Sequence, residues 1–314
     1  MTLGDENLPK LAFLGPLGSH SYQCARDGFG TNVQYVEKPT ISDVFNAVSN
    51  EIPFGLIPQE NSIYGSVTET YDLLRLPAVG EDRFVRGELT LPVRHCLLVR
   101  RGVQLESIRR VLSHEQALGQ CAHFLSERLP GAVRVKTPST SAAAQALLSE
   151  EEGDQTLQSA AICAALCATI FDGLEVLHDN IQDNDTNLTR FYVLASSLDA
   201  SLPSDALQRY ARRRALVRIS EGLSEQTAAP HGRLIQLVIS TLLTTFGSPA
   251  TRIDRRPSIS GVEGDIYVIE LEDSTGPPSP GSHAVTDALW LSRVRAGIER
   301  VQVAGGDAQL LGVW

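Results

Sequence analysis

A polar run that ends directly on an apolar segment is the feature that most constrains this chain. Nine of the twelve residues at 180–191 (NIQDNDTNLTRF) carry polar or charged side chains, and each would need a partner if it were buried. Asn, Asp and Thr also tend to bond to nearby backbone instead of forming a helix. Residues 191–195 (FYVLA) are apolar and β-prone, which predicts a buried strand. The sequence therefore predicts a polar loop anchored on a core strand.

Three side chains at the end of this loop could serve a ligand. Thr189 offers a hydroxyl, Arg190 a guanidinium and Phe191 an aromatic wall, and a rigid strand would hold all three in place. A solvated turn fits the same residues, and this stretch alone does not separate the two interpretations.

Composition and charge exclude several classes of protein. With 314 residues, of which 42% are hydrophobic, one large domain or two domains are expected. Residues 1–7 have no apolar core of a signal peptide and no apolar run reaches 18 residues, so we expect a cytoplasmic protein that does not enter a membrane. Five cysteines without a CxxC pair predict reduced thiols and no metal site. A net charge of -10 argues against nucleic acid as a partner.

Strand-like and helix-like segments alternate from residue 11 to residue 195, which predicts an α/β fold with largely parallel sheets. In such sheets ligands bind beyond the carboxyl ends of the strands. Residues 91–99 (LPVRHCLLV) are expected to cross between two lobes, with His95 as a core or edge residue. Residues 159–170 are expected to form a buried Ala-rich helix.

Four strand-to-helix corners are expected to face one cleft. They carry Ser19, Ser62, Ser113 and Thr140, and Gln116 follows Ser113 in the spacing of a capping box. Because the first N–H groups of a helix attract anions, these corners favour a ligand with more than one carboxylate.

The tail has a pattern of its own after a polar and basic linker at 201–213. Its order of elements is βαββαβ, which is typical of a ferredoxin-like unit. Strands are predicted at 215–219, 250–253, 266–271 and 308–313, and helices at 232–246 and 285–301.

Five motifs in a fixed order give the chain a family resemblance. They are GPLGSHSY (15–22), IPQENSIYGSV (57–67), SHEQALGQC (113–121), STSAAAQAL (139–147) and DGLEVLHDNIQDNDTNLTRF (172–191). In this order and spacing the chain resembles prephenate dehydratase with a C-terminal ACT regulatory domain.

The resemblance implies a two-lobed catalytic domain similar to type II periplasmic binding proteins, at residues 10–200. Lobe 1 would comprise about 10–93 and 188–200, and lobe 2 about 94–187. The ACT domain would occupy 214–314, and ACT-type pairing between chains implies a homodimer or homotetramer.

The implied reaction converts prephenate to phenylpyruvate in phenylalanine biosynthesis, with loss of carbon dioxide and hydroxide. This is the reaction of a carbon-oxygen lyase, and no cofactor is expected because the ring itself carries the electrons. The family's catalytic residues correspond to Thr189, Arg190 and Phe191, and its cleft residues to Gly18, Ser19, Glu60, Asn61 and Ser62. Thr189 would donate a proton to the leaving hydroxide, Arg190 would clamp the side-chain carboxylate and Phe191 would cover the ring.

The tail departs further from the family pattern. The positions that bind phenylalanine in family ACT domains correspond here to His231, Gly232, Leu234, Asp254, Arg256 and Pro257, and Arg255 replaces a serine. Phenylalanine is therefore the expected effector. Two alternatives stay open, an arogenate dehydratase and a ligand sensor without enzymatic activity.

Overall fold

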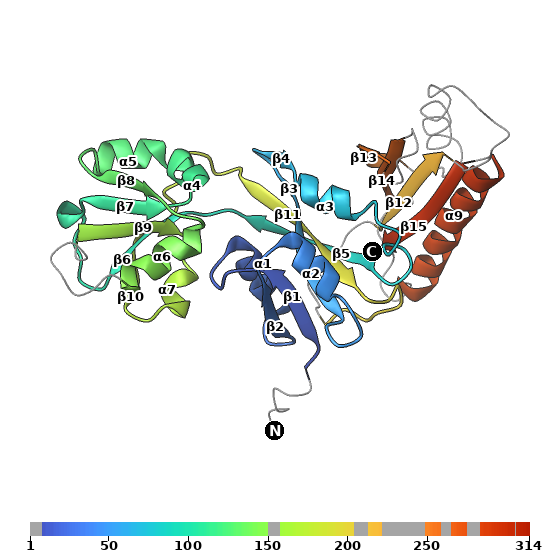
Figure 1. Ribbon diagram of the computed structural model, residues 1–314, viewed down its shortest axis with the longest axis horizontal. Helices are drawn as coiled ribbons and strands as arrows, with labels where there is room; N and C mark the ends of the chain where they lie inside the picture. The colour runs from blue at the N-terminus through green and yellow to red at the C-terminus, as the bar shows by residue number, and fades with distance from the viewer. Residues whose placement is uncertain are drawn as a thin grey trace.

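A computed structural model describes residues 8–149, 158–203, 213–221, 249–258, 265–274, 283–304 and 306–314. The described chain forms two α/β lobes and a C-terminal block arranged in a row (Figure 1). None of its described helices is long and apolar enough to cross a membrane.

The first lobe is built on the strands nearest the N-terminus. These are β1 (Lys10–Leu14), β2 (Gln34–Lys38), β3 (Phe54–Asn61), β4 (Gly65–Ser66), β5 (Phe84–Pro92) and β11 (Leu188–Ala195). The helices are α1 (His20–Phe29), α2 (Ile41–Ala47) and α3 (Thr68–Leu73). Strand β1 is parallel to β2 and β3, whereas β11 lies antiparallel between β3 and β5. The carboxyl end of β3 therefore lies beside the amino end of β11.

The second lobe contains a separate five-stranded sheet in the order β10-β6-β9-β7-β8. Its strands are β6 (Cys96–Arg100), β7 (Arg110–Ser113), β8 (Val133–Lys136), β9 (Ser159–Cys163) and β10 (Leu174–His178). Its helices are α4 (Glu115–Gln120), α5 (Ala122–Arg128), α6 (Thr140–Ser149), α7 (Cys167–Ile170) and the short 3-10 turn η2 (Leu105–Ser107).

The chain crosses between the lobes twice. It leaves the first lobe between β5 and β6 and returns between β10 and β11. The first crossing lies within residues 91–99, as the sequence predicted. Figure 1 shows β5 and β11 extending toward the second lobe.

The prediction of one helix over residues 159–170 is wrong. Residues Ser159–Cys163 form strand β9, and only Cys167–Ile170 is helical. Every residue of β9 is buried, since β6 and β7 flank the strand and helices α4 and α6 pack on its two faces. A strand buried on both faces has no alternation of polar and apolar residues, so its Ala-rich sequence resembled a helix.

The C-terminal block continues the first lobe's sheet. Strands β12 (Arg214–Glu221), β13 (Ala250–Pro257), β14 (Asp265–Glu272) and β15 (Gly306–Val313) accompany helix α9 (His283–Val303). They agree with the strands and the second helix predicted for the tail, whereas the helix predicted at 232–246 lies outside the described residues.

Together the first lobe and the block form a ten-stranded sheet. Its main order is β13-β14-β12-β15-β5-β11-β3-β1-β2, with β4 paired to β3. Strand β15 meets β5 in parallel at Gly312 and Val85. A Cβ atom at Gly312 would lie 2.0 Å from the carbonyl oxygen of Val85, so only glycine permits this close approach.

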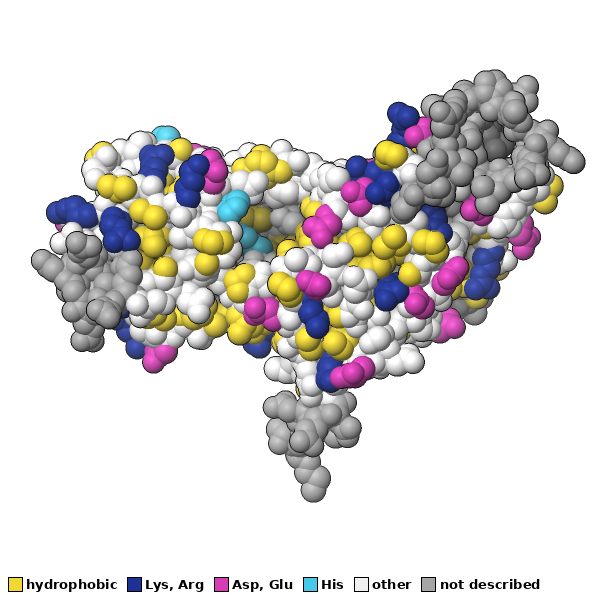
Figure 2. Space-filling model, in the orientation of Figure 1, with side chains coloured by type: hydrophobic (Ala, Val, Ile, Leu, Met, Phe, Trp, Pro, Cys, Tyr) yellow, Lys and Arg dark blue, Asp and Glu magenta, His cyan; other side chains and the backbone are white. Residues whose placement is uncertain are grey.

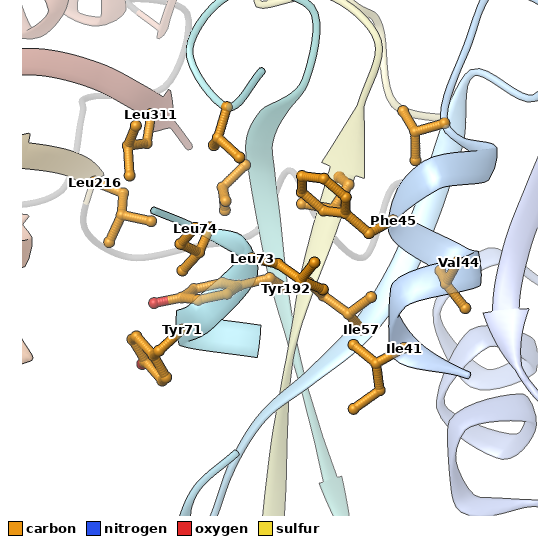
Figure 3. Close-up of a cluster of buried hydrophobic side chains, with 14 of the residues drawn as sticks. Ile41, Val44, Phe45, Ile57, Tyr71, Leu73, Leu74, Tyr192, Leu216 and Leu311 are labelled. Carbon is orange, nitrogen blue, oxygen red and sulfur yellow. The ribbon is translucent and has the colours of Figure 1, made fainter. Parts of the chain in front are cut away.

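A hydrophobic cluster covers this junction. It joins Tyr71 and Tyr192 of the first lobe to Leu216 and Leu311 of the C-terminal block, and all four are fully buried. Figure 3 shows these side chains close to one another between α3, β11 and the block. The block and the first lobe therefore share one core.

Candidate active site

A cavity of about 400 Å³ lies between the two lobes. Five of the predicted site residues line it, namely Ser19, Asn61, Gln116, Thr140 and Thr189. His20, Tyr64, His95, His114, Gln120, Ser139 and Asn187 also contribute. Figure 2 shows the surface hollowed between the lobes, with histidine side chains beside the hollow. Among the residues that the structure describes, none that lines the cavity is Asp, Glu, Lys or Arg, so this part of the wall offers polar groups without a permanent charge.

Thr189 is held at the wall by its partner strand. It lies opposite Asn61 in the β11–β3 ladder, and the Asn61 amide nitrogen donates to the Thr189 hydroxyl oxygen at 3.0 Å. The Asn61 side-chain oxygen accepts from the backbone N–H groups of Ile63 and Tyr64, at 2.9 and 3.1 Å. These bonds fix the amide orientation, so the Thr189 oxygen is an acceptor and its proton is available to a ligand.

Further amides extend this network toward the second lobe. Asn61 also donates to the Asn187 side-chain oxygen at 2.8 Å. The Asn187 amide nitrogen in turn lies 3.3 Å from the Gln120 side-chain oxygen, which is 2.6 Å from Nε2 of His95. The network therefore connects residues of both lobes along one side of the cavity.

Two longer helices begin at the cavity from opposite lobes. The Ser19 hydroxyl caps α1 by accepting from the N–H of Tyr22 at 3.2 Å. At the start of α6, the Ser139 hydroxyl accepts from the N–H of Ala142 at 3.0 Å. The earliest N–H groups of a helix have no partner within it, so each helix start can receive an anionic group.

His20 and His95 at the wall are uncharged near neutral pH. Burial, with a smaller contribution from His95, lowers the pKa of His20 to about 4. Burial also lowers the pKa of His95, against the opposing hydrogen bond with Gln120. The two rings meet nearly edge-on, with centroids 5.6 Å apart. His95 was expected to be a satisfied core or edge residue, but its Nδ1 is buried without a hydrogen-bond partner.

The structure corrects the placement expected for Arg190. Its guanidinium does not line the cavity but donates to Glu88 at 2.9 and 2.7 Å. It also lies 3.4 Å from Glu60 and 3.5 Å from Glu270 of the C-terminal block. Burial alone would lower the pKa of Arg190, yet its hydrogen bonds to Glu88 and the nearby carboxylates raise it overall. Because successive strand residues point to opposite faces, Thr189 and Arg190 cannot both face the cavity.

Phe191 is also placed away from the cavity. Its side chain is 1% exposed and packs in the first lobe's core with Leu11, Phe13 and Phe29. A β-bulge separates it from Arg190. Phe191 therefore supports the strand from within the core, and it does not cover a ligand in this arrangement.

Four other predicted cleft residues do not line the cavity. Glu60 accepts from Arg190 and Arg252. The Ser62 hydroxyl donates to the carbonyl of Thr186 at 3.2 Å and accepts from the N–H of Leu188 at 2.9 Å, which fixes the polar loop. Ser113 is fully buried and donates to the carbonyl of Ile162 at 2.6 Å. Gly18 has a φ of 82° and packs against Ser141 and Cys167 of the second lobe.

The expected effector positions are only partly described. His231, Gly232 and Leu234 lie outside the described residues. Asp254, Arg256 and Pro257 lie on β13, where the carboxylate of Asp254 is 3.1 Å from Nε of Arg256. The carbonyl of Pro257 accepts from Arg75 of the first lobe at 2.7 Å. Arg255 is exposed and pairs with Asp265 at 2.8 Å.

Asn187, Gln120 and His95 were not predicted to belong to the site. Asn187 and Gln120 belong to the motifs quoted above, and their amides meet only because the lobes come together. The apolar surroundings of His95 indicated burial but gave no sign of its partner.

Comparisons with known proteins identify relatives of this chain. The profile of the family "Prephenate dehydratase" matches residues 11–198. The bifunctional chorismate mutase/prephenate dehydratase of Neisseria gonorrhoeae is 31% identical over 83% of this chain and 66% of its own length. The arogenate dehydratase/prephenate dehydratase 6 of Arabidopsis thaliana is 37% identical over 59% of this chain and 43% of its own. The chain thus spans about two thirds of the first relative and less than half of the second.

A solved structure extends the similarity to the C-terminal block. The prephenate dehydratase of Arthrobacter aurescens in complex with L-Phe has a TM-score of 0.72 and 26% identity. The match covers 97% of this chain and 89% of that one. With the family profile matching well over half of its length, the chain belongs to the prephenate dehydratase family.

Proposed function

We propose that this chain converts prephenate to phenylpyruvate, with loss of carbon dioxide and hydroxide. The observation that carries the proposal is the Thr189 hydroxyl at the cavity wall, whose oxygen accepts from Asn61. Family membership supports the reaction class.

Thr189 is the group that assists the departing hydroxide. Its oxygen is occupied by the Asn61 amide, so its own proton can be directed at the leaving oxygen. A threonine hydroxyl is a weak acid in water, but a hydrogen bond gains strength in a closed site of low dielectric. General-acid assistance of this kind contributes roughly 10²–10⁴-fold in rate.

The helix starts provide for the two carboxylates of prephenate. One carboxylate would lie at the start of α1 and the other at the start of α6, which belong to different lobes. The wall residues that the structure describes include no Lys or Arg. This suits the carboxylate that is lost, because tight pairing with a fixed cation would oppose the flow of its charge into the ring.

Arg190 has a supporting role in this mechanism. Its ion pairs with Glu88, Glu60 and Glu270 hold β11 in place on the face opposite the cavity. The guanidinium thereby keeps Thr189 in register with Asn61 without contacting the substrate.

An arogenate dehydratase is the second candidate, because the Arabidopsis relative carries both activities in its name. Arogenate has an ammonium group where prephenate has a keto group. Among the described residues, the cavity wall has no Asp or Glu to pair with an ammonium, and burying an unpaired charge is costly. This favours prephenate.

Incubating the purified chain with each substrate separates the candidates. Prephenate turnover should yield phenylpyruvate, with kcat/KM for prephenate at least tenfold above that for arogenate. Higher kcat/KM for arogenate would overturn the substrate assignment. Binding of prephenate without turnover of either compound would indicate a sensor and overturn the enzymatic proposal.

We further propose that the C-terminal block is an ACT-type regulatory domain with phenylalanine as its effector. The Arthrobacter relative is in complex with L-Phe, and β12, β13, β14, α9 and β15 follow the order expected for such a unit. Calorimetry with phenylalanine, on wild type and Arg255→Ser, tests the effector. Light scattering tests the expected homodimer or homotetramer.

A further inference from the structure

A chain of hydrogen bonds runs from Thr189 to His95 across the boundary between the lobes. Thr189 and Asn61 lie on β11 and β3 of the first lobe, and Asn187 directly precedes β11. Gln120 ends helix α4 of the second lobe. The successive separations are 3.0, 2.8, 3.3 and 2.6 Å.

The direction of every hydrogen bond in this series follows from the fixed orientation of the Asn61 amide. Because the Asn61 oxygen accepts from two backbone N–H groups, its nitrogen must donate to Asn187. The Asn187 oxygen is thus an acceptor, and its nitrogen donates to the oxygen of Gln120. The Gln120 oxygen can only accept, so Nε2 of His95 must carry the hydrogen in the bond they share. A neutral His95 then has no hydrogen on Nδ1.

His95 is a rigid end for the chain. Its side chain is 2% exposed. Its backbone N–H donates to the side-chain oxygen of Gln182 at 2.9 Å, and its carbonyl accepts from Ile181 at 2.9 Å. The residue lies where the chain crosses from β5 to β6. A shift of the second lobe would therefore move His95 and, through it, the hydrogen-bonded amides.

We propose that His95 is a positioning residue for the dehydration. Through Gln120 and Asn187 it holds the Asn61 amide nitrogen in position at the Thr189 oxygen, although it is separated from Thr189 by three side chains. The backbone N–H groups of Ile63 and Tyr64 set the orientation of that amide. The inference rests on the proposed function, because it assigns Thr189 the proton-donating role.

Substitutions at His95 test the role by kinetics. His95→Leu removes the donor to Gln120, and kcat for prephenate should fall about 10- to 100-fold, as expected for a misplaced catalytic group, with KM within about twofold of wild type. His95→Gln retains an N–H donor and should recover most of that loss. His178→Leu, on β10 against Phe124, controls for loss of a second-lobe histidine and should keep wild-type kcat.

A double variant distinguishes positioning from a general effect on the fold. If His95 acts through Thr189, His95→Leu should lower kcat by less than twofold in a Thr189→Val background. Equal losses in both backgrounds would overturn the proposal, as would wild-type kcat in His95→Leu. A limb of the kcat pH profile that disappears in His95→Gln would mean that His95 exchanges a proton with substrate, and this too would overturn it.

The tautomer of His95 is a test that needs no activity. Two-bond proton–nitrogen NMR spectra, assigned by comparison with His95→Gln, should show hydrogen on Nε2 and none on Nδ1 near neutral pH. The opposite tautomer would overturn the chain of bonds. If wild type turns over neither substrate, the proposed function fails, and the NMR result still decides whether the hydrogen-bond chain exists.

Discussion

Arg190 on β11 and Glu88 on β5 form a two-pronged ion pair, Nε to Oε1 at 2.9 Å and Nη2 to Oε2 at 2.7 Å. Arg214 of the C-terminal block donates to the same Glu88 at 2.8 Å, and both arginines approach Glu270. The strand that carries Thr189 is thus tied to the C-terminal block by charged groups, of which Glu88 and Glu270 are buried.

Arg190→Lys should weaken the protein without weakening substrate binding. A lysine keeps the charge but cannot reproduce the planar fork, so we expect the free energy of unfolding in urea to fall by about 1–3 kcal/mol. KM for prephenate should change by less than about twofold, because Arg190 does not line the cavity. Arg101→Lys, in an exposed pair with Asp172, should cost less than about 0.5 kcal/mol. A large rise in KM at unchanged stability would instead support a carboxylate clamp.

Removal of the Thr189 hydroxyl should act mainly on kcat. Thr189→Val should lower kcat by about 10²–10⁴-fold with near-normal KM, whereas Thr189→Ser should retain most of the activity. Thr90→Val removes an exposed hydroxyl from the neighbouring strand β5 and should have no effect on kcat. A loss of less than about tenfold in Thr189→Val would refute the proton-donor role.

His20 should make the protein sensitive to acid. Its pKa in the folded protein is about 4, mainly because of burial, against an ordinary value near 6.5. Between these values the unfolded chain binds a proton that the folded chain does not. The contribution of neutral His20 to the free energy of unfolding is therefore fully present above about pH 6.5 and falls as the pH decreases toward 4. His95 acts in the same direction. Urea unfolding at pH 7 and pH 5 should show a smaller loss for His20→Gln than for wild type.

Gly312→Ala should open the junction between β15 and β5. The added methyl group would meet the Val85 carbonyl oxygen at 2.0 Å, and relief requires backbone movement costing about 1–3 kcal/mol. Thermal unfolding should occur at a lower temperature, and the amide hydrogens of both strands should exchange faster. At Gly131 an added Cβ meets nothing within 4 Å, so Gly131→Ala is the matched control and should leave the melting temperature unchanged or slightly higher.

The fold of the first lobe could be predicted because its elements follow local rules. Apolar strands led into capped helices, and the Ser19 cap of α1 is present. Strand β9 could not be predicted, because complete burial removed the alternation that marks a strand.

The site was harder to predict than the fold. Thr189, Asn61, Ser19, Gln116 and Thr140 lie at the cavity because each is at, or next to, the end of a strand or helix there. Arg190 was assigned to the same side as Thr189, although the period of two along a strand places neighbours on opposite faces. The amide chain to His95 depends on contacts between residues as much as 128 positions apart, which no local pattern records.

The single sheet that runs from β2 to β13 limits how the chain can be shortened or recombined with a relative. Cutting the chain before β12 would uncover β5 where Gly312 meets Val85, together with the hydrophobic cluster at this junction, which invites association with other chains. Shortened forms should therefore aggregate unless that border is shielded. If the tail were exchanged for one from a relative, the replacement strand would need a glycine where Gly312 of β15 meets Val85.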